Sequence, residues 1–174
     1  FTGFHTQFFE SPTRPWFVLL PREGRPLAVI PGIGEPAMRE TWVEDIRTWP
    51  APRPADDGIS LLATAIHEVA GRKGRVGVPM GHETHLRMPL ADWAALQGAT
   101  PGIGFEDATS IVRGLRMVKS EAEIAKVAHV CGIVSDAFEG LPQLLSAGMT
   151  ERGAFRAFRI DLLERGADDV PYLV

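Results

Sequence analysis

Cysteine is nearly absent from this chain of 174 residues, which contains only Cys131. An intramolecular disulfide is therefore impossible, and the place of Cys131 on an apolar helical stripe predicts a buried, reduced thiol. No apolar run approaches the ~20 residues that a transmembrane helix needs, and no charged-then-apolar signal segment opens the chain. We therefore expect a soluble, cytoplasmic protein with no membrane partner.

Clusters of basic residues are missing as well. The formal net charge is −4, whereas a nucleic-acid-binding surface is basic. We therefore expect no nucleic-acid partner. Disorder is excluded by composition, because 45% of the residues are hydrophobic and such a chain can build a core. The length suits one ordinary domain and part of another.

Motifs for metals and nucleotides are incomplete. His67 and Glu68 begin a zinc-binding His-Glu-x-x-His pattern, but position 71 is a glycine, so the second imidazole is missing. His82 and His85 lie three residues apart on an apparent loop, where a metal site would need at least one further ligand. The two Pro-Gly-Ile-Gly stretches lack the third glycine of a dinucleotide site. These patterns favour solvated helix and loop residues.

The most informative stretch runs from 114 to 146. Ser120 followed three residues later by Glu123 predicts a capping box at the start of a helix. Apolar residues then recur at steps of three and four, which places them on one helical face. Gly140 and Pro142 predict a kink or break before the last turn. The expected buried stripe consists of Ile124, Val127, Cys131, Val134, Phe138, Leu141 and Leu145.

Strand and helix patterns alternate before this stretch, as is typical of a layered α/β domain. We expect a mixed sheet flanked by helices up to about residue 113. The expected elements are a hairpin of Trp16–Leu20 and Leu27–Ile30, a short helix from Pro36 to about Trp42, a strand around Ile46, a helix capped by Asp56 or Asp57 with the face Ile59, Leu62, Ala63, Ile66, Val69 and Ala70, a strand from Arg75 to Pro79, and a helix around Leu90–Leu96.

The end of the chain predicts one more helix. Thr150 can cap it, and Gly166 can close it. Its expected buried face is Phe155, Phe158 and Leu162, and a strand is expected from 170 to 174. The second part of the chain should therefore be two helices that pack through the Ile124 and Phe155 faces.

Four short motifs together resemble one enzyme family. Residues 115–124 read Leu-Arg-Met-Val-Lys-Ser-Glu-Ala-Glu-Ile, which is similar to the segment that opens the catalytic domain of the creatinase/prolidase/aminopeptidase P metallohydrolases. Further matches are Phe1-Thr-Gly-Phe4, Gly74-Arg-Val-Gly-Val78 and Gly148-Met-Thr-Glu151. The resemblance implies a creatinase/prolidase-type N-terminal domain at 1–113, followed at 114–174 by the beginning of an α+β pita-bread metallohydrolase domain.

In this family two divalent ions, such as Mn, Co or Zn, activate a water and polarise a carbonyl. They are held by two aspartates, one histidine and two glutamates, and the resemblance places these ligands past the last residue of this sequence. None of Asp161, Asp168 or Asp169 matches their motif. The chain also opens at Phe1 without an initiator methionine. We therefore expect a fragment with no catalytic residue and no metal ligand, inactive by itself.

The resemblance also implies a role for the first domain. In several members it makes homodimer or tetramer contacts and overhangs the partner's active site. In the creatinase-like branch an arginine just before a core strand reaches the substrate's carboxylate, and Arg14 occupies a similar place. A guanidinium can hold a carboxylate with two parallel hydrogen bonds. Phe8 or Phe9 is the expected aromatic partner, and packing in a core or interface is the alternative interpretation of both.

The sequence thus leads to one first hypothesis and two alternatives. The first is the N-terminal portion of a metal-dependent Xaa-Pro dipeptidase or aminopeptidase-like hydrolase, which acts on a small peptide or amide. In that enzyme, this chain would mediate homo-oligomerisation and cap the bound substrate. One alternative is a creatinase-like or ectoine-hydrolase-like C–N hydrolase. The other is a non-catalytic, peptidase-like binding or dimerisation module.

Overall fold

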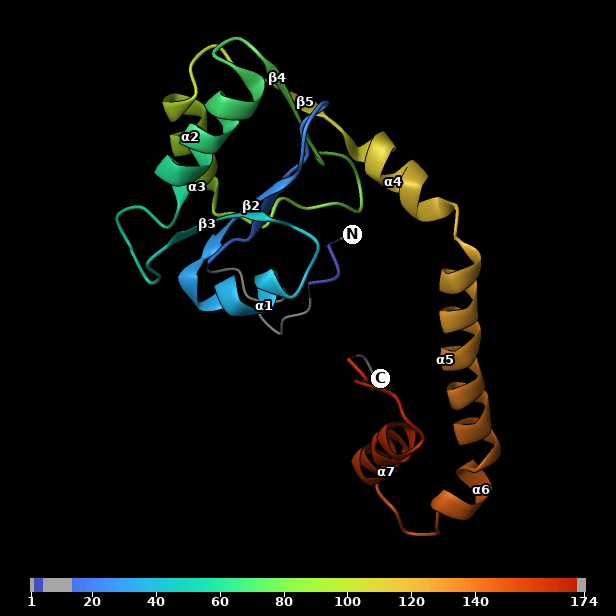
Figure 1. The fold of residues 1–174 in the computed structure, drawn as a ribbon. Helices are drawn as coiled ribbons and strands as arrows, with labels where there is room; N and C mark the ends of the chain where they lie inside the picture. The colour runs from blue at the N-terminus through green and yellow to red at the C-terminus, as the bar shows by residue number, and fades with distance from the viewer. Residues whose placement is uncertain (1, 5–13, 172–174) are drawn as a thin grey trace. The chain divides into compact units, whose positions relative to one another are not determined.

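The computed structural model describes residues 2–4 and 14–171. The chain divides into two compact units, Phe1–Arg113 and Gly114–Val174, which Figure 1 shows in blue to yellow and in orange to red. Each unit has a buried apolar cluster of its own. No helix among the described residues is long and apolar enough to cross a membrane.

The described residues of the first unit form two small sheets. Strands β1 (Phe17–Leu19), β2 (Leu27–Pro31) and β3 (Asp45–Trp49) form a mixed sheet in the order β1-β2-β3. β1 runs antiparallel to β2, and β3 runs parallel to it. β4 (Arg75–Val78) and β5 (Gly104–Asp107) form a parallel pair. The structure therefore confirms the predicted mixed α/β fold, including the hairpin and the strand around Ile46.

Helices accompany both sheets. After a single 3-10 turn at Gly32–Gly34 come α1 (Glu35–Arg39), α2 (Ile59–Ala70) and α3 (Leu90–Ala99). A further helix, α4 (Thr109–Met117), crosses the division between the units. The sequence patterns predicted no element at 104–117, so β5 and α4 were both missed. The local signal was the carboxylate of Asp107, which accepts the backbone N–H of Thr109 and begins α4.

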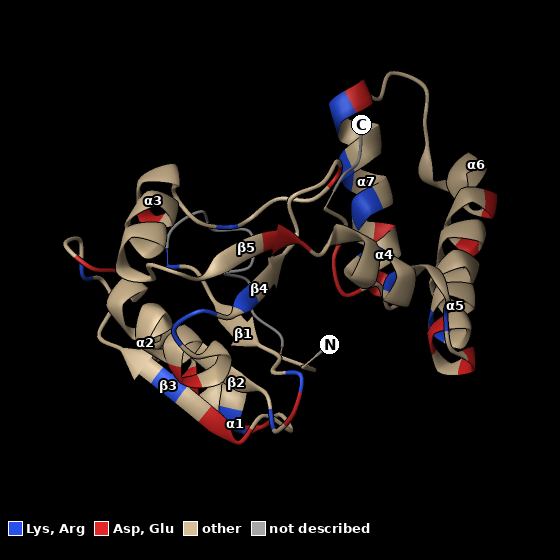
Figure 2. Ribbon diagram, turned by 90° about the horizontal axis from the view of Figure 1, so that it is seen from above, with Lys and Arg blue, Asp and Glu red and all other residues tan. Residues whose placement is uncertain are grey.

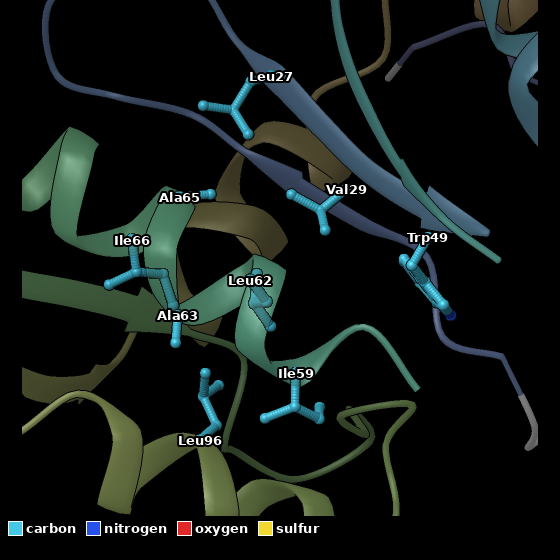
Figure 3. Close-up of a cluster of buried hydrophobic side chains, with 9 residues drawn as sticks. All are labelled: Leu27, Val29, Trp49, Ile59, Leu62, Ala63, Ala65, Ile66 and Leu96. Carbon is cyan, nitrogen blue, oxygen red and sulfur yellow. The ribbon is translucent and has the colours of Figure 1, made fainter. Parts of the chain in front are cut away.

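β2 is buried on both of its faces. Leu27 is 3% exposed, and Ala28, Val29 and Ile30 are fully buried. Because side chains alternate along a strand, Leu27 and Val29 contact α2 on one face (Figure 3), whereas Ala28 and Ile30 pack with Met38 and Val43 on the other. A strand that is buried on both faces has a continuous run of apolar residues in its sequence. Residues 27–31 form such a run.

The start of α2 differs from the prediction. The residue at the N-cap is Gly58, with a φ of 90°, and not Asp56 or Asp57. A Cβ on Gly58 would lie 2.6 Å from the ring of Trp49, so the close approach selects glycine. Asp56 still accepts the N–H of Ser60 at 3.0 Å, and its hydrogen bonds with the hydroxyl and N–H of Ser60 lower the pKa of this carboxyl. Asp57 instead accepts the indole N–H of Trp49 at 3.1 Å.

The second unit contains α5 (Glu121–Glu139), α6 (Leu141–Leu144) and α7 (Glu151–Glu164). The capping box is confirmed, because the N–H of Glu123 donates to Ser120 Oγ at 3.3 Å and the N–H of Ser120 donates back to Glu123 Oε2 at 2.8 Å. The same bonds to Ser120 lower the pKa of Glu123. The predicted break falls between α5 and α6. Thr150 caps α7 by accepting the N–H of Gly153 at 3.1 Å.

The buried face of α5 is not the predicted stripe. α5 contacts α7 through Ile133 and Ala137, which cluster with Phe158 and Leu162. Most of the predicted stripe is exposed, with Ile124, Val127 and Phe138 each at 56%. Cys131 is exposed too, which corrects the expected buried thiol. The face of α7 is confirmed, with Phe155 half-buried. Residues 170 and 171 are not in a strand, and the rest of that prediction lies outside the described residues.

The close approach of Gly58 to Trp49 gives a first prediction. Gly58→Ala should lower the free energy of unfolding of the first unit by roughly 2–4 kcal/mol, from left-handed strain plus overpacking. Gly24→Ala is the matched control, because Gly24 has a φ of 101° but no neighbour closer than 4.0 Å to its added Cβ. It should cost only about 1 kcal/mol.

Urea unfolding followed by tryptophan fluorescence measures this difference, because the chain's four tryptophans all precede residue 114. Equal losses in the two variants would contradict the account of Gly58.

Candidate functional site

Arg14 has an unusual backbone conformation. Its φ of 60° lies in the left-handed region, which costs a non-glycine residue about 1 kcal/mol or more. The residue is half-buried and precedes the buried Pro15. No hydrogen bond or ion pair joins its guanidinium to another of the residues 2–4 and 14–171. The structure thus leaves the role of Arg14 as a prediction, and Phe8 and Phe9 lie outside the described residues.

Trp16 anchors the segment that carries Arg14. A Cβ on Gly34 would come within 1.9 Å of its six-membered ring, so only glycine permits this packing. The ring centroid also lies 5.0 Å from that of Phe4. Within the described part of the chain, no acceptor reaches the buried Nε1 of Trp16. The start of β1 is therefore fixed by the packing of an aromatic side chain.

A hydrogen-bonded clamp joins the loop after β4 to the start of α4. Thr109 Oγ1 accepts the backbone N–H of Met80 at 3.0 Å and of Gly81 at 2.7 Å. Asp107 Oδ1 accepts the N–H of Met80 at 3.0 Å and of Thr109 at 2.9 Å. The hydroxyl of Thr109, followed by these two amides, lowers the pKa of Asp107. The Asp-x-Thr spacing is the sequence signal that could have revealed the clamp.

The clamped loop also carries two of the candidate metal ligands. Arg113 donates to the carbonyl of His82 at 2.6 Å, and Arg87 Nε lies 3.2 Å from His85 Nε2. In the part of the chain that the structure describes, no three His, Cys, Asp or Glu side chains gather in a way that could hold a metal ion. These residues therefore do not fit the pair of divalent ions that the resemblance implies.

The second candidate pair, His67 and Glu68, takes part in contacts between elements. The ring nitrogens of His67 lie 3.4 Å from the carbonyl of Gly71 and 3.3 Å from that of Ala99. Glu68 forms an ion pair with Arg47 of β3. Hydrogen bonds to Asp45 and then Glu68 raise the pKa of Arg47. Charges of both signs are interspersed in this way along the elements (Figure 2).

An apolar groove lies in the first unit. Its volume is about 530 Å³, within the usual range for a ligand pocket. β1 and β4 line it, as do side chains of α2 and α3. Its charged lining residues are Arg22 and Arg75. Among the described residues, the lining of the groove includes no side chain that could act as a nucleophile or a general base.

The fold matches solved structures of peptidases over nearly the whole chain. A prolidase from Thermococcus sibiricus matches with a TM-score of 0.78 at 22% identity, over 98% of this chain and 44% of its own. A dipeptidase from Pyrococcus horikoshii OT3 matches with 0.74 at 19% identity, over 98% and 44%. An X-Pro aminopeptidase from Thermotoga maritima MSB8 matches with 0.73 at 23% identity, over 99% and 42%.

This chain has the fold of these peptidases. It spans about two fifths of the length of the solved structures that it matches. Neither a protein-family model nor a curated protein matches the chain. The likeness confirms the fold that the resemblance predicts, and at these low identities it bears on the fold alone.

The clamp gives a second prediction, on stability in acid. Because the folded-state pKa of Asp107 is lowered, its stabilising contribution is present above the ordinary value of 3.8 and is lost as the pH falls through the folded-state pKa. Asp107→Asn removes this titration. The variant should therefore be less stable than the parent chain near pH 6, and the difference should shrink as the pH falls below about 4.

Urea unfolding at a series of pH values, followed by tryptophan fluorescence, measures that difference. Glu23→Gln, at an exposed acidic residue in the β1–β2 turn, is the control and should leave the pH profile close to that of the parent chain. A difference between Asp107→Asn and the parent chain that does not change with pH would contradict the role of the ionised carboxylate.

Proposed function

We propose that this chain is the N-terminal portion of a metal-dependent Xaa-Pro dipeptidase or aminopeptidase-like hydrolase of the cytoplasm. The observation that carries the proposal is the likeness to three peptidases over 98–99% of the chain. The four motifs of the sequence support it independently, because they follow one another in the order of the creatinase/prolidase/aminopeptidase P family.

The second unit supports the same proposal. Its helices expose apolar side chains that a complete domain would bury, among them Ile124, Val127, Val130, Phe138 and Ile160. The opening helices of a larger α+β domain would have this property, because further elements of that domain would cover them. On this proposal the unit begins the catalytic domain of the full-length enzyme.

The metal ions of such an enzyme would be held outside residues 1–174. They would activate the water that attacks the scissile amide, and the described residues contribute no ligand to them. What this chain supplies is the first unit, which would make contacts between copies of the protein and cover the substrate. A small peptide or amide is the proposed substrate class.

Arg14 is the proposed substrate-binding residue of the first unit. Its position is fixed by the buried Pro15 and by Trp16, so little ordering would be needed when a carboxylate arrives. A guanidinium matches a carboxylate in geometry and charge. In the proposed oligomer this group would reach the C-terminal carboxylate of a substrate bound to the partner copy.

The activity is tested on the full-length protein. With Mn²⁺ we expect hydrolysis of Ala-Pro, little hydrolysis of Ala-Ala, and loss of activity with a chelator that excess metal restores. Hydrolysis of creatine or of ectoine in place of Ala-Pro would favour the C–N hydrolase alternative. No hydrolysis of any of these substrates by a correctly folded, metal-loaded protein would favour the non-catalytic module.

The role of Arg14 is tested by substitution in the same protein. Arg14→Ala should lower kcat/KM for a dipeptide by roughly 1.5–3 kcal/mol in transition-state free energy, the range for a hydrogen bond to a charged group. Arg14→Lys should recover only part of it, because an ammonium lacks the fork of a guanidinium. Arg72→Ala, at an exposed arginine in a turn, is the matched control. Unchanged kinetics in both Arg14 variants, with the oligomer intact, would exclude the proposed contact.

A further inference from the structure

Helix α4 belongs to both units of the chain. The division falls between Arg113 and Gly114, which lie in the middle of this helix. With nine residues, α4 is shorter than the ~12–15 residues that a helix needs to be stable by itself in water. Residues 113–117 are all exposed in the part of the chain that the structure describes, so little packing supports this half of the helix. The helix that joins the units therefore depends mainly on its own backbone hydrogen bonds.

Gly114 weakens α4 at this division. Its backbone does not lie in the left-handed region, and a Cβ added to it would meet no described atom within 4 Å outside the backbone of the helix itself. Neither a turn nor a close approach therefore requires a glycine here. A glycine inside a helix makes opening of that helix about fivefold easier than an alanine does. Gly114 is thus the point at which α4 opens most readily.

The chain is held by hydrogen bonds on both sides of Gly114. On the side of the first unit, Arg113 donates to the carbonyl of His82 at 2.6 Å, next to the clamp that begins α4. On the other side, the ammonium of Lys119 donates to the last two carbonyls of α4, and the capping box of α5 follows directly. The segment 118–120 is therefore fastened at both of its ends, whereas no side chain fastens the helix at Gly114.

We propose that α4 bends at Gly114 and that this hinge lets the first unit move as a rigid body relative to the second. Hinges of this kind are a few residues that absorb a change in φ and ψ between two packed bodies. Under the proposed function the first unit covers the substrate, so the movement would admit the substrate and release the product. That use of the hinge rests on the proposed function, whereas the hinge itself does not.

Electron spin resonance between two labels in the full-length protein measures the movement as a distribution of distances. Cys131→Ser removes the cysteine of this chain, and exposed residues carry the labels: Glu23→Cys in the first unit and Arg152→Cys in the second. Labelled protomers are diluted with unlabelled ones, so that distances within one protomer dominate. The parent protein should give a broad distribution, and Gly114→Ala should lower the population of its minor distances about fivefold.

Gly132→Ala is the matched control. Gly132 also lies inside a helix, and its added Cβ would likewise meet nothing within 4 Å, but it belongs wholly to the second unit. This variant should leave the distribution unchanged. A label pair within the first unit, Glu23→Cys with Arg72→Cys, should give one narrow distance. A parent distribution as narrow as that pair gives, or one that Gly114→Ala does not narrow, would overturn the hinge.

The same two glycine variants test what the movement does. If it admits the substrate, Gly114→Ala should lower kcat/KM for Ala-Pro at least about threefold, and Gly132→Ala should leave it unchanged. A narrowed distance distribution with unchanged kcat/KM would exclude the role in substrate entry. If the parent protein hydrolyses none of the substrates, the proposed function fails, and the distance distributions alone then decide whether Gly114 is a hinge.

Discussion

Burial of β2 on both faces is the constraint on which the first unit depends. Leu27 and Val29 require a cover on one side, which α2 and α3 provide, and Ala28 and Ile30 require another, which α1 and the segment around Val43 provide. β1 and β3 pair with the two hydrogen-bonding edges of β2. The side chain of Trp49 fills the space where the chain passes from β3 into α2, so the residue at that turn must be a glycine, Gly58.

Elsewhere in the chain, apolar surface is buried only in part by the other elements. In the second unit α7 covers α5 at Ile133 and Ala137 but leaves Ile124 and Val127 exposed. In the first unit the facing edges of β1 and β4 leave an apolar groove. Both features agree with a chain that matches peptidases over about two fifths of their length. The proposal of an incomplete catalytic domain rests on the exposed apolar side chains of the second unit, which need a partner.

Patterns among neighbouring residues predicted the elements that depend on contacts between residues close in the sequence. The apolar run of β2, the face of α2 and the Ser120–Glu123 capping box all follow from neighbouring residues, and the structure confirms each of them. Long-range contacts decided the rest. The N-cap of α2 depends on Trp49, which lies nine residues before Gly58, and the buried face of α5 depends on α7. Periodicity alone places an apolar stripe on α5 but does not say which part of it this chain covers. For the candidate site, the resemblance predicted Arg14, which stays a prediction, and the sequence patterns missed the clamp of Asp107 and Thr109.

The most direct test of the central claim is the reactivity of Cys131, which lies on the exposed stripe of α5. Its rate of alkylation by a small maleimide can be measured in chain 1–174 and in the full-length protein, with the labelled peptide located by mass spectrometry. If the second unit is the beginning of a larger domain that covers this stripe, the thiol should react readily in chain 1–174 and at least about tenfold more slowly in the full-length protein, where opening of the structure must precede reaction. Equal rates in the two proteins would mean that α5 remains uncovered, and the account of an incomplete domain would be wrong.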